Sequence, residues 1–79
     1  MAQATMVKAT GFTRHIPARE ARGLISVSME SHPIYGYRTT VSTIVRGSGV
    51  DRGLGAWQDR EAAERMFDGL VYLFRTLDS

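Results

Sequence analysis

The C-terminal part of the chain carries one apolar stripe with the period of an α-helix, and this pattern limits the fold more than any other. Asp59 is a suitable N-cap, and Glu61 and Glu64 lie near the positive end of the helix dipole. The sequence therefore predicts one amphipathic helix over residues 60–77, which must bury its stripe against another layer. The stripe follows spacings of three and four residues: Ala63, Met66, Phe67, Leu70, Phe74 and Leu77.

The segments before this helix have the features of β-strands. Leu24–Glu30 and Tyr37–Arg46 alternate between two sets of side chains, as half-buried strands do. The six residues Ser31–Gly36 between them include turn-forming types, so we expect a hairpin. Thr5–Thr13 is rich in β-branched residues and is expected as a further strand, and Leu54–Trp57 as a short fourth strand.

These elements predict a single small α+β domain over residues 1–79. The expected fold is one antiparallel sheet of three to four strands, with the C-terminal helix packed on one face. Pro17–Arg22 fits either a helical turn or a plain loop. The face expected under the helix is apolar: Ile25, Val27, Met29, Tyr37, Val41 and Val45. The other face is expected to be open, hydroxyl-rich and basic: Ser26, Ser28, Arg38, Thr40, Ser42 and Arg46, with Lys8 beside them.

Length and charge narrow the class of protein further. A chain of 79 residues without cysteine has a thin core and no disulfides, so we expect support from oligomerisation or from another protein. Residues 1–58 carry seven basic and three acidic side chains, and residues 59–79 carry three and five. A basic sheet and an acidic helix can orient a partner. No apolar run is long enough to span a membrane and no signal peptide is visible, so we expect a cytoplasmic protein.

The sequence lacks the motifs of catalysis and of cofactor binding. Gly47–Gly55 is dense in glycine but has neither the lysine of a phosphate loop nor the spacing of a dinucleotide fingerprint. We interpret it as a flexible hairpin connection; the alternative is a loop that adapts to a partner, with Asp51 and Arg52 at its tip. His15 and His32 are not part of paired metal ligands. We therefore expect no catalytic residue, no metal, no cofactor and no enzymatic activity.

Three groups of residues are candidate binding sites. The first binds a protein partner through charged side chains and Tyr72, an aromatic residue in the centre of the polar helix face: Asp51, Arg52, Glu61, Arg65, Asp68 and Tyr72. The second is a strip on the helix flank that suits a homodimer, or alternatively ordinary edge packing: Ala62, Met66, Gly69 and Leu73. The third would contact nucleic-acid phosphates, with Phe12 and Tyr35 as stacking aromatics: Lys8, Arg38 and Arg46.

Two resemblances accompany these patterns. The stretch Gly53–Ala63 resembles the last strand and helix start of three-stranded DNA-binding domains, such as the plant ethylene-response-factor domain and the arm-binding domain of tyrosine recombinases. That resemblance implies a sheet laid in the major groove. The whole chain is similar in kind to small phage proteins that disable host machinery, the anti-CRISPR inhibitors among them. This second resemblance implies a non-enzymatic inhibitor or accessory factor that occludes a site on a larger host complex. Nucleic-acid binding is the alternative.

Overall fold

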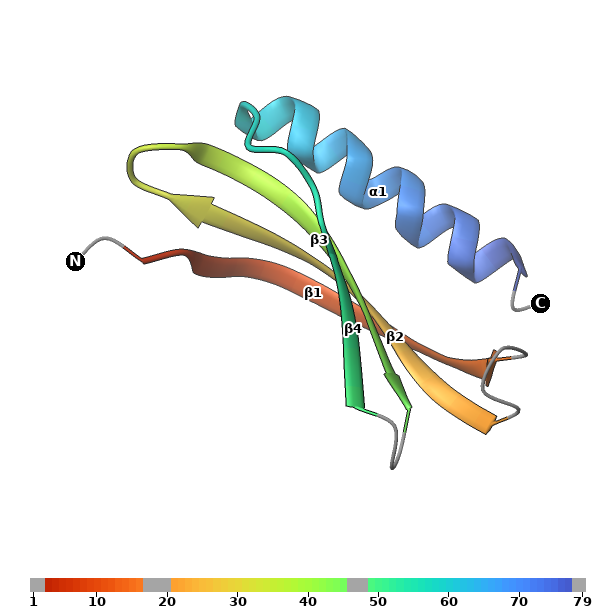
Figure 1. The fold of residues 1–79 in the computed structure, drawn as a ribbon. Coiled ribbons are helices and arrows are strands. Elements are labelled where there is room, and N and C mark those ends of the chain that lie inside the picture. Colours follow the sequence, from red (N-terminus) through yellow and green to blue (C-terminus); the bar gives the residue numbers. More distant parts are fainter. Residues whose placement is uncertain (1–2, 17–20, 46–48, 78–79) are drawn as a thin grey trace.

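The described residues form four strands followed by one helix (Figure 1). The structure is a computed structural model that describes residues 3–16, 21–45 and 49–77. The strands pair antiparallel in the order β1-β2-β3-β4, and α1 lies across one face of the sheet. The predicted α+β fold with a C-terminal helix is confirmed. The elements are β1 (Thr5–Ile16), β2 (Ala21–His32), β3 (Gly36–Val45), β4 (Gly49–Leu54) and α1 (Arg60–Leu77).

Helix α1 begins where the sequence predicts. The Asp59 carboxylate caps it, because Oδ1 accepts a hydrogen bond of 2.7 Å from the backbone N–H of Ala62. Arg60 and Glu64 form an ion pair of 3.6 Å one turn apart. These contacts satisfy the start of the helix and leave its apolar stripe to pack on the sheet.

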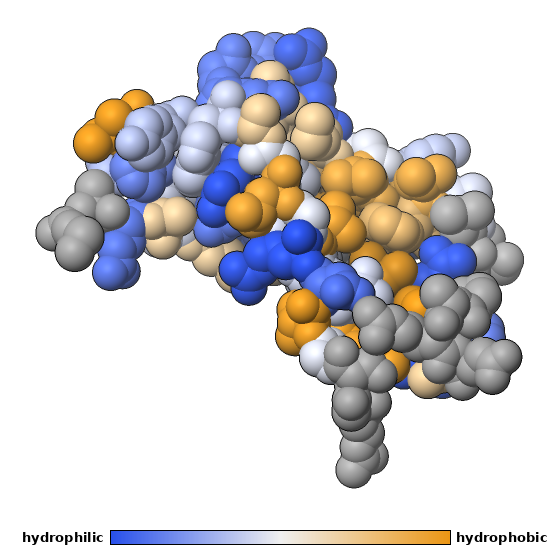
Figure 2. Space-filling view, in the orientation of Figure 1, coloured by the Kyte–Doolittle hydropathy of each residue, from blue (hydrophilic) through white to orange (hydrophobic). Residues whose placement is uncertain are grey.

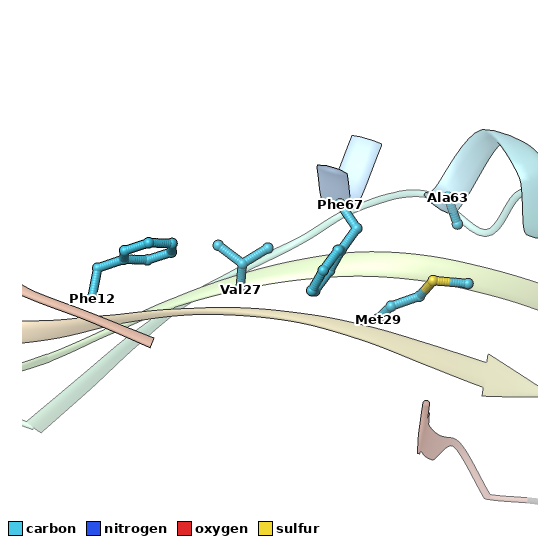
Figure 3. Close-up of a cluster of buried hydrophobic side chains, with 5 residues drawn as sticks. All are labelled: Phe12, Val27, Met29, Ala63 and Phe67. Carbon is cyan, nitrogen blue, oxygen red and sulfur yellow. The ribbon is translucent and has the colours of Figure 1, made fainter. Parts of the chain in front are cut away.

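The core lies between α1 and the sheet, and its buried cluster combines side chains of α1, β1 and β2 (Figure 3). Val27, Met29 and Ala63 are fully buried, so they form the centre of this interface. Phe12 was a candidate for base stacking, and the structure corrects this: its ring is buried and lies 6.0 Å from that of Phe74. The buried cluster and the half-buried residues packed against it are Phe12, Val27, Met29, Ala63 and Phe67, then Tyr37, Leu70, Val71 and Phe74.

The two hairpins of the sheet differ from the predicted ones. His32 pairs with Gly36, so the first loop has three residues, 33–35, and not six. The glycine-dense segment is not merely a connection, because β4 occupies Gly49–Leu54 and pairs with β3. The fourth strand was expected at Leu54–Trp57, after the position where the structure has it.

For the connection between β1 and β2, the sequence is compatible with either a helical turn or a plain loop. Ala21 and Arg22 are already part of β2, so the helical alternative is wrong for these two residues. Residues 17–20 lie outside the part of the chain that the structure describes.

The strand register decides which side chains face α1. Val27 stands opposite Val41, and Met29 opposite Thr39, whose hydroxyl donates a hydrogen bond of 2.8 Å to the carbonyl oxygen of Ala63. Residues in one row across an antiparallel sheet share a face, so these rows lie under the helix. The alternate rows, which include Ser28 and Thr40, form the open face.

Candidate functional site

The outer line of α1 contains four of the predicted partner-binding residues. Glu61, Arg65, Asp68 and Tyr72 are all exposed, and their spacings of four, three and four residues place them on one helical face. Tyr72 is the most exposed of the large apolar side chains of the described residues, at 74%. The structure therefore brings these four residues together as the sequence predicts.

A second line, the flank strip, runs beside the first on the same helix. Met66 and Leu73 are 42% and 49% exposed, Ala62 is half-buried, and a Cβ atom built on Gly69 would meet nothing within 4 Å. Figure 2 shows apolar surface left in the open along α1 as well as near β4. Together with Tyr72, the flank strip gives the helix an exposed apolar surface bordered by charges.

Asp51 and Arg52 do not belong to this helical surface. Both are exposed in β4, where successive side chains point to opposite faces of the sheet. Arg52 stands opposite Ser42 on the open face, whereas Asp51 stands opposite Thr43 in a row of the helix-facing side. They are strand residues and not the tip of an adaptable loop, which corrects the predicted arrangement.

The three basic residues of the nucleic-acid alternative are not gathered on one face. Lys8 stands opposite Met29, on the side of the sheet that α1 covers, and not beside Arg38 as expected. Its ammonium lies 4.7 Å from the centre of the Phe67 ring and 3.9 Å from the Asp68 carboxylate. Arg46 lies outside the described residues. Lys8 therefore links β1 to α1 through a cation–π contact with Phe67 and an ion pair with Asp68.

Arg38 lies on the open face, but Glu30 already pairs with its charge and Trp57 stacks on its guanidinium plane. Its Nε donates a hydrogen bond of 3.2 Å to Glu30 Oε1, which also accepts one of 2.9 Å from the Thr40 hydroxyl. The guanidinium carbon sits 4.2 Å from the centre of the Trp57 ring. Only 19% of the side chain is exposed. A phosphate would have to displace these partners before it could bind Arg38.

An aromatic cluster at the β2–β3 turn was not predicted. The rings of His32 and Tyr35 stack at 4.5 Å, and the Trp57 ring lies 5.5 and 5.9 Å from them. His32 Nδ1 accepts hydrogen bonds from the backbone N–H groups of Ile34 and Tyr35, which holds the turn. Trp57 is distant in sequence and is brought to the turn by backbone hydrogen bonds of the flanking Gly55 and Gln58 to β3, so no local sequence signal could have placed it there.

The open sheet face holds a shallow hollow of about 270 Å³. The Ser28 hydroxyl donates to the carbonyl oxygen of Thr40 at 3.5 Å, and Thr40 in turn donates to Glu30, so two of its hydroxyls are bound within the sheet. Apolar side chains border the hollow, and Val50 is 56% exposed. The residues that line it are Met6, Ser26, Ser28, Glu30, Thr40, Ser42, Ile44, Val50 and Arg52.

Neither a metal centre nor a membrane-spanning helix is found in the part of the chain that the structure describes. Over residues 3–16, 21–45 and 49–77, no three His, Cys, Asp or Glu side chains are grouped to hold a metal ion. The one helix of these residues is not apolar enough along its length to cross a membrane. Comparisons with models of protein families, with curated proteins and with solved structures find no match for this chain.

Proposed function

We propose that this protein is a non-enzymatic protein-binding factor that acts through the outer surface of α1. The observation that carries the proposal is the exposure of Tyr72, Leu73 and Met66 on one helix, beside Glu61 and Asp68. A tyrosine set among charges, next to an apolar strip, has the composition of an interface hot spot with a polar rim. In the form proposed from the resemblance to small phage inhibitors, the partner is a site on a larger host complex that this helix occludes.

A photo-crosslinking experiment tests this proposal. Benzoylphenylalanine is placed at Tyr72 and, as a matched control, at Tyr35, which is also an exposed tyrosine but lies at the β2–β3 turn. In a bacterial lysate, we expect a discrete protein adduct from position 72 and none from position 35. The adduct should be lost when Leu73→Glu is added, because that change puts a charge into the apolar surface. Equal labelling from both positions, or no adduct from position 72, would contradict the proposal.

Nucleic-acid binding remains the alternative, and the contacts of Arg38 argue against it. We expect duplex DNA to bind no tighter than about micromolar at physiological salt, which is the non-specific range. Affinity should be measured by fluorescence anisotropy at several salt concentrations, for the wild type and for the Arg38→Ala/Arg46→Ala double variant. A tight, sequence-selective complex whose salt dependence is flattened in the double variant would reverse the ranking. Circular dichroism must show that this variant is folded, since Arg38→Ala leaves Glu30 without its ion pair.

The flank strip supports a further prediction, that the isolated protein is a homodimer. Two copies related by a two-fold axis would pack closely over Gly69, where nothing in the described chain lies within 4 Å, and would cover Met66 and Leu73. Gly69→Leu should separate the two helices and shift the protein to monomer while it stays helical. Arg65→Leu is the control, because it places the same leucine side chain on the outer line and not in the strip. Light scattering decides the matter, and a wild-type mass of one chain at high concentration would refute the dimer.

A further inference from the structure

The two edges of the sheet differ in length and composition. β1 has 12 residues and pairs only with β2, so in the described part of the chain one side of its backbone carries free N–H and C=O groups. In Figure 1, β1 forms the outer margin of the sheet. β4, at the other margin, has six residues, of which two are glycine and two are charged. β4 is thus short and has features that protect an edge from pairing, whereas β1 is long, and its register shift and Lys8 lie near its N-terminal end.

The contacts of β1 with the helix leave this edge available. They run through side chains of one face of the strand, where Phe12 meets Phe74 and Lys8 meets Phe67 and Asp68. Side chains of one face stand roughly perpendicular to the sheet, so they do not occupy the backbone groups of the edge. A register shift lies between Met6 and Lys8, and the regular stretch is Lys8–Ile16. Nine residues exceed the length of a typical paired strand.

The open-face side chains next to this edge are small. Ala9, Gly11 and Thr13 are all exposed, and they alternate with the helix-facing residues of the strand. An added strand can therefore approach without meeting bulky side chains of β1 on that face. The side chain of Leu24, which is 39% exposed, already lies over Gly11, 3.1 Å from where a Cβ atom would stand, so an added strand would pack against this leucine.

The charged residues of the edge strand itself are all basic, and the acid nearest to them in the helix is Asp68, 3.9 Å from the Lys8 ammonium. β1 contains Lys8 and Arg14 and no acidic residue, and Arg22 follows on the neighbouring strand opposite His15. The acid of β2, Glu30, is bound to Arg38 and Thr40. Two β1 strands joined at this edge would bring four cationic side chains into one strand pair, with no carboxylate from either strand to balance them. Like charges on facing positions destabilise a pair of strands, so a second copy does not suit this edge.

We propose that the free edge of β1 binds an extended, acidic segment of a protein partner by strand addition. Main-chain hydrogen bonds to Lys8–Ile16 supply the affinity, and carboxylates that face Arg14 supply the preference for an acidic sequence, since the Lys8 ammonium already lies 3.9 Å from Asp68. This surface is distinct from the outer face of α1. The crosslinking result at position 72 therefore does not test the strand-addition proposal.

The probe is a blocked peptide of about eight residues in which threonine and glutamate alternate. Two controls match it: a threonine–lysine peptide of the same length, and a threonine–glutamate peptide N-methylated at alternate positions, which keeps the charge but removes backbone donors from one edge. Binding is followed by 15N NMR titration of the full chain. We expect the acidic peptide to shift backbone amide signals of Lys8–Ile16 and to bind roughly tenfold more tightly than the lysine peptide, since each charge contact changes sign.

Arg14→Glu should abolish this preference, because it replaces the cation that faces the peptide with an acid while Lys8 and Arg22 remain. Signals from α1 and β3 in the same spectra show whether the variant is folded. If it is not, His15→Glu serves instead, as an exposed change on the same strand. Binding of the N-methylated peptide as tight as that of its parent would show attraction of charge alone and overturn strand addition. No amide shifts in β1 at millimolar acidic peptide, or equal affinity for the lysine peptide, would also overturn the proposal.

Discussion

Phe67→Ala is expected to destabilise the protein by about 3–5 kcal/mol. The ring is 7% exposed and belongs to the small cluster that holds α1 on the sheet, together with Val27 and Met29 (Figure 3). It also supports Lys8, whose ammonium lies 4.7 Å from the ring centre. Domains of this size are stable by only about 5–15 kcal/mol, so this single change can leave a large part of the protein unfolded at room temperature.

Neighbouring helix positions provide matched controls for this experiment. Met66 is 42% exposed, so Met66→Ala should cost much less than Phe67→Ala even though the two positions are adjacent. Leu70→Ala should fall between them, because Leu70 is half-buried and packs against the cluster from its margin. Urea unfolding followed by circular dichroism gives the three free energies. If Phe67→Ala unfolds at the same urea concentration as wild type, the stripe identified here does not hold the helix to the sheet.

The helix could be predicted because its information is local. The apolar period and the Asp59 cap lie within a few residues of one another, and the cap forms as expected. The stripe packs on the sheet through Ala63, Phe67, Leu70 and Phe74, whereas Met66, which the pattern also included, is 42% exposed. The facing of β2 could be predicted for the same reason, since Val27 and Met29 alternate with Ser26 and Ser28 in sequence and between faces. An uninterrupted period of two or of 3.6 residues was therefore sufficient to predict the type of element and the face that it buries.

The position of β4 could not be predicted, because its residues have little strand propensity of their own. Gly49 and Gly53 favour turns, and the segment is extended in the structure, where it pairs with β3. Lys8 was misplaced for a related reason. The register shift between Met6 and Lys8 changes the face on which the later residues of β1 point, and an irregularity of this kind has no clear signal in a single sequence.

The ion pair between Arg38 and Glu30 could not be predicted, because the predicted loop between β2 and β3 was too long. A hairpin loop over residues 31–36 would place Glu30 opposite Tyr37, whereas the observed pair of His32 and Gly36 places it opposite Arg38. A shift of one residue exchanges all cross-strand partners, so the predicted face looked more basic than it is. The residues of the open face could thus be predicted from the sequence. Their charge pairs could not, because these depend on the register that the pairing of His32 with Gly36 sets.

Gly36→Ala is expected to cost about 2 kcal/mol or more, because two separate penalties meet at this residue. Its φ angle is 97°, a left-handed conformation that residues with a side chain rarely adopt. A Cβ atom there would also lie 2.6 Å from the carbonyl oxygen of Gln58. That oxygen cannot retreat freely, since it accepts a hydrogen bond of 2.8 Å from the N–H of Tyr37. The substitution must therefore distort either the turn or the bridge between β3 and the segment that leads into α1.

Two other glycines separate these penalties. Gly49 has a φ angle of 87° and open space around its Cβ position, so Gly49→Ala should show the backbone cost alone, about 1 kcal/mol. Gly69 lies within α1, also in open space, and Gly69→Ala should stabilise the protein by up to about 1 kcal/mol, measured at low concentration to limit self-association. Thermal melts should therefore rank Gly36→Ala lowest, then Gly49→Ala, then wild type, with Gly69→Ala highest. If Gly36→Ala and Gly49→Ala melt together, the close approach of Gln58 contributes nothing, and the bridge that brings Trp57 to the β2–β3 turn is looser than the contact at 2.6 Å implies.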